Sequence, residues 1–122
     1  MKIYNVALIG CGHMGETHLE HIYFKEEICI RCVCDKDETR AREFQRKFGA
    51  KSISLDAEEC IRRDDVDIVI IATYPSTHLA LLKLCLKYKK HVICEKPIAA
   101  NLKEGREFVE QVKSHPDVKV LV

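Results

Sequence analysis

The sequence lacks a dominant charge, a membrane-length apolar run and any low-complexity tract. Its 122 residues carry 20 lysines and arginines against 19 aspartates and glutamates, so the formal charge is only +1. Binding to nucleic acid or to an anionic membrane usually needs a clustered basic excess, which this balance does not provide. No apolar stretch approaches the roughly 18 residues that a bilayer-spanning helix requires. Valine, isoleucine and leucine are plentiful, so we expect an ordered domain that binds neither nucleic acid nor membrane.

The N-terminus also lacks an export signal. The segment MKIYNVALIG has too short an apolar part for a signal peptide and no small-residue cleavage site, and a first strand explains it better. The seven cysteines are an odd number. Without an export signal, an odd count indicates reduced thiols, and we expect a cytoplasmic protein.

Three of the cysteines are spaced closely enough to suggest a metal site. Cys29, Cys32 and Cys34 lie, however, inside an apolar run with a period of two. This period predicts that Ile28, Ile30, Cys32 and Cys34 share one face of a strand, while Cys29 and Cys32 point to opposite faces. Cysteines on opposite faces cannot bind one metal ion together. We therefore expect these thiols to fill the core, and we expect no metal site.

Apolar runs alternate with helix-like segments along the whole chain. The expected strands are 4–9, 28–34, a weak one at 51–54, 68–72, 91–94 and 118–122. The expected helices are 14–24, 37–48, 57–63, 77–89 and 101–113. Several strands are continuous apolar runs, which is typical of parallel strands covered on both faces. The alternation predicts an α/β domain of three layers with a doubly wound parallel sheet of about six strands.

Residues 1–122 are expected to form a single domain, because no linker and no internal repeat interrupts this pattern. The last five residues, 118–122, have the pattern of an apolar strand with no turn after it. We therefore expect the domain to belong to a longer chain.

A glycine motif follows the first expected strand and opens the first expected helix. Gly10, Gly12 and Gly15 match G-x-G-x-x-G, in which the glycines allow a tight turn, close approach to a pyrophosphate and tight helix packing. The pyrophosphate would lie on the amides of the helix N-terminus. Asp35 follows about 20 residues later at the end of the second strand, where an acidic residue binds an adenosine ribose. The pattern predicts a Rossmann-type dinucleotide-binding domain, and the alternative is a glycine turn that binds nothing.

Asp35 also bears on the choice between NAD and NADP. Its carboxylate would accept hydrogen bonds from the ribose 2′-hydroxyl and repel a 2′-phosphate. Lys36 and Arg40 are close enough in sequence to counter this repulsion, but we expect NAD to be preferred. Cys11 lies near a helix N-terminus, which can lower a thiol pKa. An ordinary side chain at a variable position of the motif explains Cys11 better than a reactive thiol does.

Two further segments carry a family resemblance. Residues 73–78 (TYPSTH) follow the fourth strand, and residues 95–97 (EKP) follow the fifth. Together with the glycine motif and the acidic residue that ends the second strand, they resemble the Gfo/Idh/MocA oxidoreductases, the family of glucose–fructose oxidoreductase and inositol dehydrogenase. The resemblance covers essentially the whole chain, but only the N-terminal half of that family.

The resemblance implies a role for each matching residue. The implied cofactor contacts are Gly10, Gly12, His13, Met14 and Gly15 at the pyrophosphate, Asp35 and Lys36 at the adenosine ribose, Thr73, Tyr74 and His78 in the nucleotide crevice, and Glu95 at the nicotinamide ribose. Lys96 would be the catalytic residue facing the substrate, and the bond between Lys96 and Pro97 would be cis. From the residues alone, His78 could instead stabilise a helix start, and Lys96 could be an ordinary solvated lysine.

The implied activity is hydride transfer between NAD(P) and a hydroxyl-bearing carbon of a sugar, cyclitol or related polyol. The substrate would bind through a second domain beyond residue 122, and the longer protein could form a homo-oligomer. We expect the 122 residues alone to bind a dinucleotide without turning over substrate. The alternative is a non-catalytic nucleotide-sensing regulatory module, which the small size favours.

Overall fold

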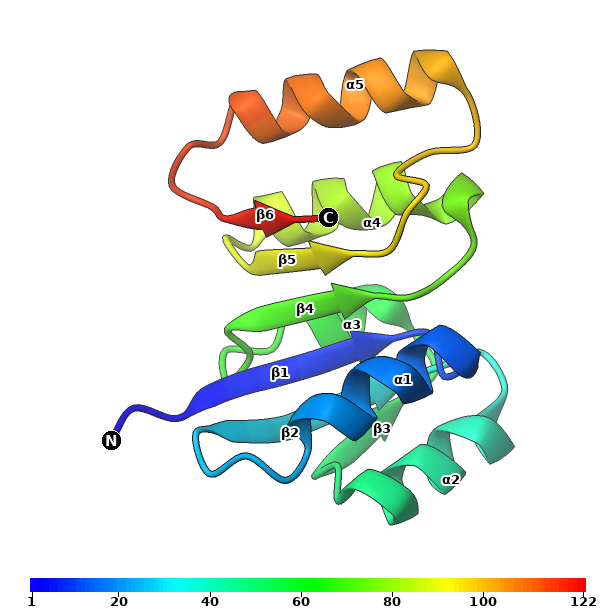
Figure 1. The fold of residues 1–122 in the computed structure, drawn as a ribbon, viewed down its shortest axis with the longest axis vertical. Helices are drawn as coiled ribbons and strands as arrows, with labels where there is room; N and C mark the ends of the chain where they lie inside the picture. The colour runs from blue at the N-terminus through cyan, green and yellow to red at the C-terminus, as the bar shows by residue number, and fades with distance from the viewer.

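The computed structural model describes residues 1–122 and contains six strands and five helices in strict alternation (Figure 1). The strands are β1 (Tyr4–Ile9), β2 (Ile28–Cys34), β3 (Ser52–Ser54), β4 (Ile68–Ile71), β5 (His91–Cys94) and β6 (Val120–Leu121). The helices are α1 (His13–Ile22), α2 (Glu38–Phe48), α3 (Ala57–Ile61), α4 (Pro75–Lys87) and α5 (Leu102–Lys113). None of the helices has the length and apolar character needed to cross a bilayer.

All strands are parallel and lie in the order β3-β2-β1-β4-β5-β6. This is the strand order of the doubly wound Rossmann fold, in which the chain reverses its direction of travel between β1 and β4. Helices α1 and α2 cover one face of β1, β2 and β3, while α3 and α4 lie behind the sheet and α5 packs beside α4 at the top of the view (Figure 1). The predicted three-layer α/β fold is confirmed.

The helix boundaries follow local chemistry that the sequence makes visible. The Asp37 side chain accepts hydrogen bonds from the backbone N–H groups of Thr39 and Arg40 and so caps α2, which ends at Gly49 in the left-handed conformation, φ 72°. The expected helix bounds differ from the observed ones by no more than two residues. Both ends of α4 lie two residues earlier than expected, and the helix begins at Pro75 because proline is well suited to the first helical position.

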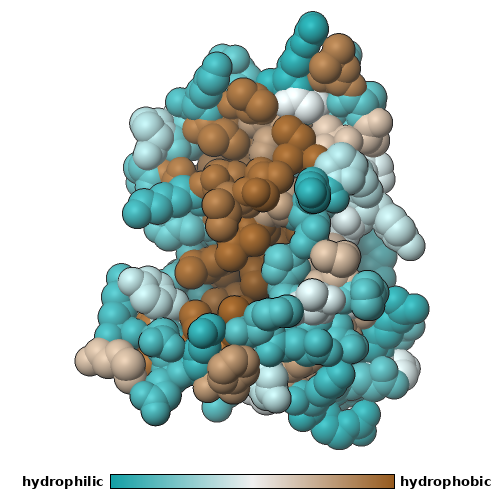
Figure 2. All heavy atoms as spheres, viewed as in Figure 1, coloured by the Kyte–Doolittle hydropathy of each residue, from teal (hydrophilic) through white to brown (hydrophobic).

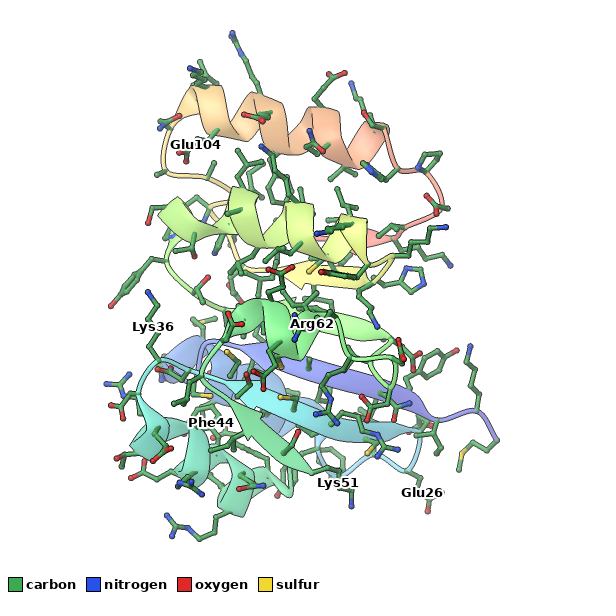
Figure 3. The ribbon with its side chains drawn as sticks, turned by 180° about the vertical axis from the view of Figure 1, so that it is seen from behind. Glu26, Lys36, Phe44, Lys51, Arg62 and Glu104 are labelled. Carbon is green, nitrogen blue, oxygen red and sulfur yellow. The ribbon has the colours of Figure 1, made fainter.

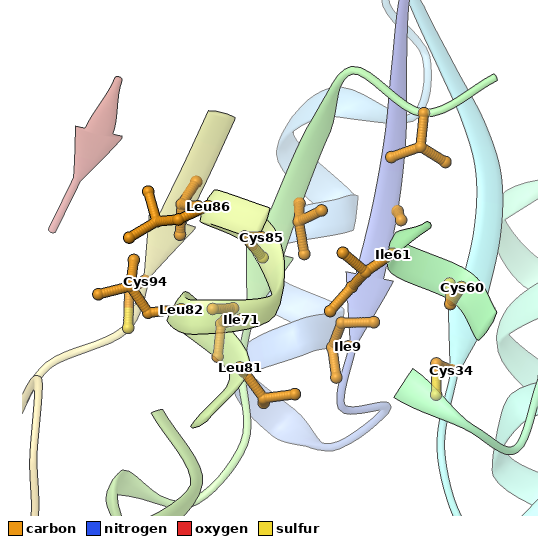
Figure 4. Close-up of a cluster of buried hydrophobic side chains, with 14 of the residues drawn as sticks. Ile9, Cys34, Cys60, Ile61, Ile71, Leu81, Leu82, Cys85, Leu86 and Cys94 are labelled. Atoms are coloured by element: carbon orange, nitrogen blue, oxygen red, sulfur yellow. The ribbon is translucent and has the colours of Figure 1, made fainter. Parts of the chain in front are cut away.

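Two apolar clusters pack the sheet between its helices. The larger contains 17 buried residues and joins the sheet to α3, α4 and α5, and Figure 4 shows its part around α3 and α4. The smaller contains 10 and joins it to α1 and α2. The face of β4, β5 and β6 toward the viewer in Figure 1 carries no helix. Figure 2 shows apolar residues gathered there, and Leu121, which pairs with Ile93, is 65% exposed.

A β-bulge interrupts the regular alternation of β2. Strand pairing joins Val6 to Ile30 and the next residue of β1, Ala7, to Cys32. Arg31 is therefore an extra residue on β2, and its Nε donates a hydrogen bond to the side chain of Asn5. The bulge reverses the face on which every later residue of β2 lies.

The bulge overturns the expected faces of β2. Ile28 and Ile30 pack against α1 and α2, whereas Cys32 and Cys34 pack in the opposite cluster. The prediction that these four residues share a face is wrong, and pairing places Cys29 on the same face as Cys32. The thiols of Cys32 and Cys34 are nonetheless core groups, because both side chains are buried among apolar neighbours. No group of three or more histidine, cysteine or carboxylate side chains is placed to hold a metal ion.

Candidate functional site

A cavity of about 880 Å³ opens at the carboxyl ends of the central strands. Its walls come from the glycine loop after β1, the ends of β2 and β3, and the loop from β4 into α4. Ligands of doubly wound sheets bind at this edge, where the strand order reverses. The volume lies within the roughly 300–1,000 Å³ typical of small-molecule sites.

The structure gives a different reason for glycine at each of the three positions of the loop. Gly10 has φ +102°, and a Cβ atom there would lie 2.5 Å from the Ala72 carbonyl oxygen. A Cβ atom at Gly15 would lie 2.2 Å from the Gly10 carbonyl oxygen. Both positions therefore require glycine for the chain itself to fold. A Cβ atom at Gly12 would meet nothing within 4 Å, so the chain itself does not require glycine there, and the loop leaves room for a ligand.

The N-terminus of α1 presents unpaired donors at this open space. Gly12 is the N-cap and supplies no side-chain cap. The backbone N–H groups of His13, Met14 and Gly15 have no acceptor in the chain. Such groups, together with the positive end of the helix dipole, favour an anion such as a pyrophosphate. Gly10, Gly12, His13 and Met14 line the cavity, while Gly15 lies behind them in the packing between helix and strand.

Asp35 joins the glycine loop to the end of β2. One carboxylate oxygen, Oδ2, accepts from the Cys11 N–H at 2.9 Å, and the other, Oδ1, accepts from the Asp37 N–H at 2.8 Å. These bonds fix the half-buried carboxylate at the cavity wall. Each oxygen of a carboxylate can accept a second hydrogen bond, so Asp35 retains the capacity to bind ribose hydroxyls.

Two cations share this wall with Asp35. Lys36 and Arg40 are exposed and line the same cavity, and Lys36 points outward from the loop after β2 (Figure 3). The Arg40 Nε lies 3.8 Å from Asp37 Oδ2, in an exposed contact that solvent weakens. This wall of the cavity therefore contains the fixed carboxylate of Asp35, a second carboxylate from Asp56, and the two exposed cations.

The segment after β4 forms the opposite wall. Thr73 and Tyr74 line the cavity, and Tyr74 is 81% exposed at its mouth. The Thr77 hydroxyl donates to the Tyr74 carbonyl at 2.7 Å and lies 2.6 Å from the Thr73 hydroxyl. His78 is not in the lining, because it is only 1% exposed. Its Nε2 donates to the Thr73 carbonyl at 3.0 Å, which fits the alternative role of stabilising the start of α4.

Glu95 and Lys96 lie at the end of β5, outside the lining of the cavity. The Glu95 backbone N–H donates to the carbonyl of Ile71, the last residue of β4, and its side chain pairs with His18 of α1. Lys96 is exposed, and the bond between Lys96 and Pro97 is cis, as the resemblance implied. The structure thus places most of the predicted residues around the cavity, while Glu95 and Lys96 lie outside its lining.

Sequence reasoning missed part of the lining and one contact. Most of the missed lining residues follow β3 or lie in α4, namely Leu55, Asp56, Ala57, Ser76, Thr77, Ala80 and Leu81. The rule that ligands bind at the carboxyl ends of strands could have found the first three, but β3 has only three residues and gave a weak signal. The contact between His18 and Glu95 joins residues 77 positions apart, and no local pattern reports it.

The thiol of Cys11, in the glycine loop, does not have the lowered pKa of a reactive cysteine. Burial raises the pKa of the Cys11 thiol to about 12, and its Sγ lies 3.5 Å from the Cys34 carbonyl oxygen. The thiol is therefore protonated near neutral pH and screened from solvent, which agrees with an ordinary side chain at this position.

Thiol labelling checks this arrangement. All cysteines except Cys29 are buried, so we expect Ellman's reagent to modify one thiol rapidly in the folded chain and all seven in denaturant. Cys29→Ser should remove the rapid phase. A rapid phase that persists in Cys29→Ser and disappears in Cys11→Ser would show that Cys11 is reactive.

Comparisons with known proteins agree with this geometry. Residues 4–122 match the sequence model of GFO_IDH_MocA, described as an oxidoreductase family with an NAD-binding Rossmann fold. Myo-inositol 2-dehydrogenase of Thermotoga maritima is 33% identical over 108 residues, which are 88% of this chain and 32% of that protein. The scyllo-inositol 2-dehydrogenase (NADP(+)) IolU of Bacillus subtilis is 32% identical over 109 residues, 89% of this chain and 33% of that protein.

A solved structure gives the same result for the fold. The crystal structure of a probable dehydrogenase from Thermotoga maritima has a TM-score of 0.87 at 32% identity, covering 96% of this chain and 34% of that one. The chain therefore spans about a third of the length of the relatives it matches. The fold, the glycine loop and these matches show that the chain belongs to the Gfo/Idh/MocA oxidoreductase family and forms its NAD-binding Rossmann domain.

Proposed function

We propose that the chain binds NAD at the carboxyl edge of its sheet and serves as the nucleotide-binding part of a longer dehydrogenase. The observation that carries this proposal is the glycine loop, where Gly12 leaves open space in front of the unpaired N–H groups of His13, Met14 and Gly15. The carboxylate of Asp35 is fixed beside that loop. An anion site next to a hydroxyl-binding carboxylate fits the pyrophosphate and ribose of a dinucleotide.

Each residue of the site would then have a role in binding. The pyrophosphate would lie on the loop of Gly10, Gly12, His13, Met14 and Gly15. The adenosine ribose would bind to Asp35 with Lys36, and the nicotinamide ribose to Glu95. Thr73 and Tyr74 would line the nucleotide crevice, with His78 supporting their loop from behind. Lys96 would hold or transfer the proton of the substrate hydroxyl, since an ammonium can both donate to an oxygen and release a proton. Bound NAD supplies the acceptor for the hydride.

The substrate class is proposed from the relatives. The sequence relatives reported above are named as inositol dehydrogenases, so we propose a cyclitol, a sugar or a related polyol. Dehydrogenase names also favour an enzyme over a nucleotide-sensing regulatory module.

The substrate would bind through a part of the protein beyond these 122 residues. The apolar face of β4, β5 and β6 supports this, because proteins rarely leave a large apolar surface uncovered. Homo-oligomerisation is proposed for the longer protein only. The odd number of cysteines and their burial support a reducing compartment such as the cytoplasm.

A preference for NAD over NADP is proposed from Asp35. A 2′-phosphate would approach a carboxylate that two backbone N–H groups hold in place and that cannot easily turn away. Lys36 and Arg40 line the same wall and would offset part of this repulsion. The B. subtilis relative is named for NADP, so the balance between these charges decides the preference.

Calorimetric titration of the chain with NAD and NADP tests this proposal. We expect NAD to bind about tenfold more tightly, which corresponds to roughly 1.4 kcal/mol. Asp35→Asn removes the charge and keeps the size of the side chain, so the difference between the NAD and NADP affinities should fall to less than about threefold. Lys36→Ala, the control at the next residue, should increase the difference between the two affinities. Equal affinities in the unmodified chain would contradict the preference, and binding of neither dinucleotide would contradict the proposed function.

A further inference from the structure

One side-chain contact joins the helix of the glycine loop to the end of β5. His18, on α1, donates from Nε2 to Oε1 of Glu95. Both side chains are partly buried, with 26% and 20% of their surfaces exposed. Glu95 Oε2 has no partner in the chain and is not sealed from solvent. The histidine therefore occupies one carboxylate oxygen and leaves the other available.

The path of a dinucleotide places this free oxygen in the site. Asp35, at the end of β2, marks the adenosine ribose, and the N-terminus of α1, beside β1, marks the pyrophosphate. The cofactor crosses the point where the strand order reverses, so its second half must continue toward the ends of β4 and β5. Glu95 is the first residue after β5.

The two ends of this contact are held by different means. The backbone of Glu95 is tied to β4, because its N–H donates to the Ile71 carbonyl at 3.1 Å. Helix α1 is held close to the loop, because Gly15 leaves no room for even a Cβ atom against Gly10. The glutamate side chain itself has several rotatable bonds and only His18 as a partner. Without that partner it would have to be ordered when a ligand binds, which weakens affinity.

We propose that His18 is a positioning residue, which holds the Glu95 carboxylate so that Oε2 accepts hydrogen bonds from the ribose beside the nicotinamide. This inference rests on the proposed function. Helix α1 would then act at two places in the site. Its first turn would bind the pyrophosphate, and its second turn, through His18, would orient the carboxylate that binds the second ribose. The competing explanation is that the contact only ties α1 to the sheet.

A comparison of two ligands separates these explanations. ADP occupies the adenosine and pyrophosphate positions and does not reach Glu95, whereas NAD reaches it. We expect His18→Ala to weaken NAD binding by about three- to tenfold, because an unordered glutamate must then be fixed on binding. ADP binding should stay within about twofold, and the thermal unfolding midpoint should change little, because a partly exposed pair contributes little to stability.

Three further variants test whether His18 acts through Glu95. His18→Gln keeps an N–H donor and should retain most of the NAD affinity. His21→Ala removes a histidine from the same helix whose ring bonds only to the Thr17 carbonyl within α1, and it should change neither affinity. In a Glu95→Ala background, His18→Ala should have no further effect on NAD binding, since the histidine acts through the glutamate.

The outcomes are distinguishable. Unchanged NAD affinity in His18→Ala overturns the assignment. Equal losses for ADP and NAD, accompanied by a lower unfolding midpoint, also overturn it, because they identify a structural tie. If the unmodified chain binds neither ligand, the proposed function fails and this assignment fails with it. Loss confined to NAD, with rescue by glutamine, supports the positioning role.

Discussion

Gly12→Val is expected to weaken NAD binding by at least about 100-fold, or roughly 2.7 kcal/mol, while the domain remains folded. The space in front of Gly12 is empty of protein atoms, since a Cβ atom would meet nothing within 4 Å. Its backbone, with φ −106° and ψ −162°, is extended and open to any residue. The added side chain would therefore cost the fold little. It would fill the space through which a pyrophosphate approaches the N–H groups of α1.

Gly10→Ala is the matched control for this variant. Its Cβ atom would lie 2.5 Å from the Ala72 carbonyl oxygen, in a backbone conformation of φ +102° that alanine rarely adopts. We expect this substitution to lower the free energy of unfolding by at least about 2 kcal/mol. Thermal unfolding measures the stability of both variants, and calorimetric titration measures their NAD affinity. Unimpaired NAD binding by folded Gly12→Val would show that the pyrophosphate does not approach this loop.

Lys96→Ala is expected to reduce kcat by about 10²–10⁴-fold in the complete dehydrogenase to which we propose the chain belongs. Lys96 is exposed at the end of β5, next to the residue that we assign to the nicotinamide ribose. The pyrophosphate has its own donors on α1, so cofactor affinity should depend little on this lysine. A proton donor and acceptor at the reacting hydroxyl would affect turnover instead.

Lys96→Arg should restore only a small part of the activity, because a guanidinium group does not release a proton in this pH range. Lys103→Ala removes another exposed lysine, on α5, and should leave kcat unchanged. The measurements are kcat on the best substrate and NAD affinity by titration. If kcat stayed within about threefold of the parent while NAD affinity collapsed, Lys96 would be a cofactor ligand and not a catalytic residue.

The amino-acid sequence alone determined the fold class and the position of the binding edge. Continuous apolar runs separated by amphipathic segments are a local pattern, and parallel strands covered on both faces require it. The glycine motif and Asp35 could be predicted as cofactor contacts from the sequence, because each lies at a fixed offset from the end of a strand. Caps such as Asp37 and Gly49 are also local, since their partners lie within a few residues.

Only the tertiary structure decided the features that depend on pairs distant in sequence. The bulge at Arg31 is set by the register between β1 and β2, and it moved Cys32 and Cys34 to the face opposite Ile30. A strand pattern assumes an uninterrupted period of two, so it cannot reveal one inserted residue.

The tertiary structure likewise decided which of the predicted residues line the cavity and which contacts the others make. His78 is buried behind the cavity and holds the Thr73 carbonyl, although its place in the motif suggested the lining. His18 meets Glu95 only because the parallel sheet brings the helix that follows β1 close to the carboxyl end of β5. The sequence indicates at which edge a side chain lies, but its direction and its partner follow from packing between elements, which no local pattern contains.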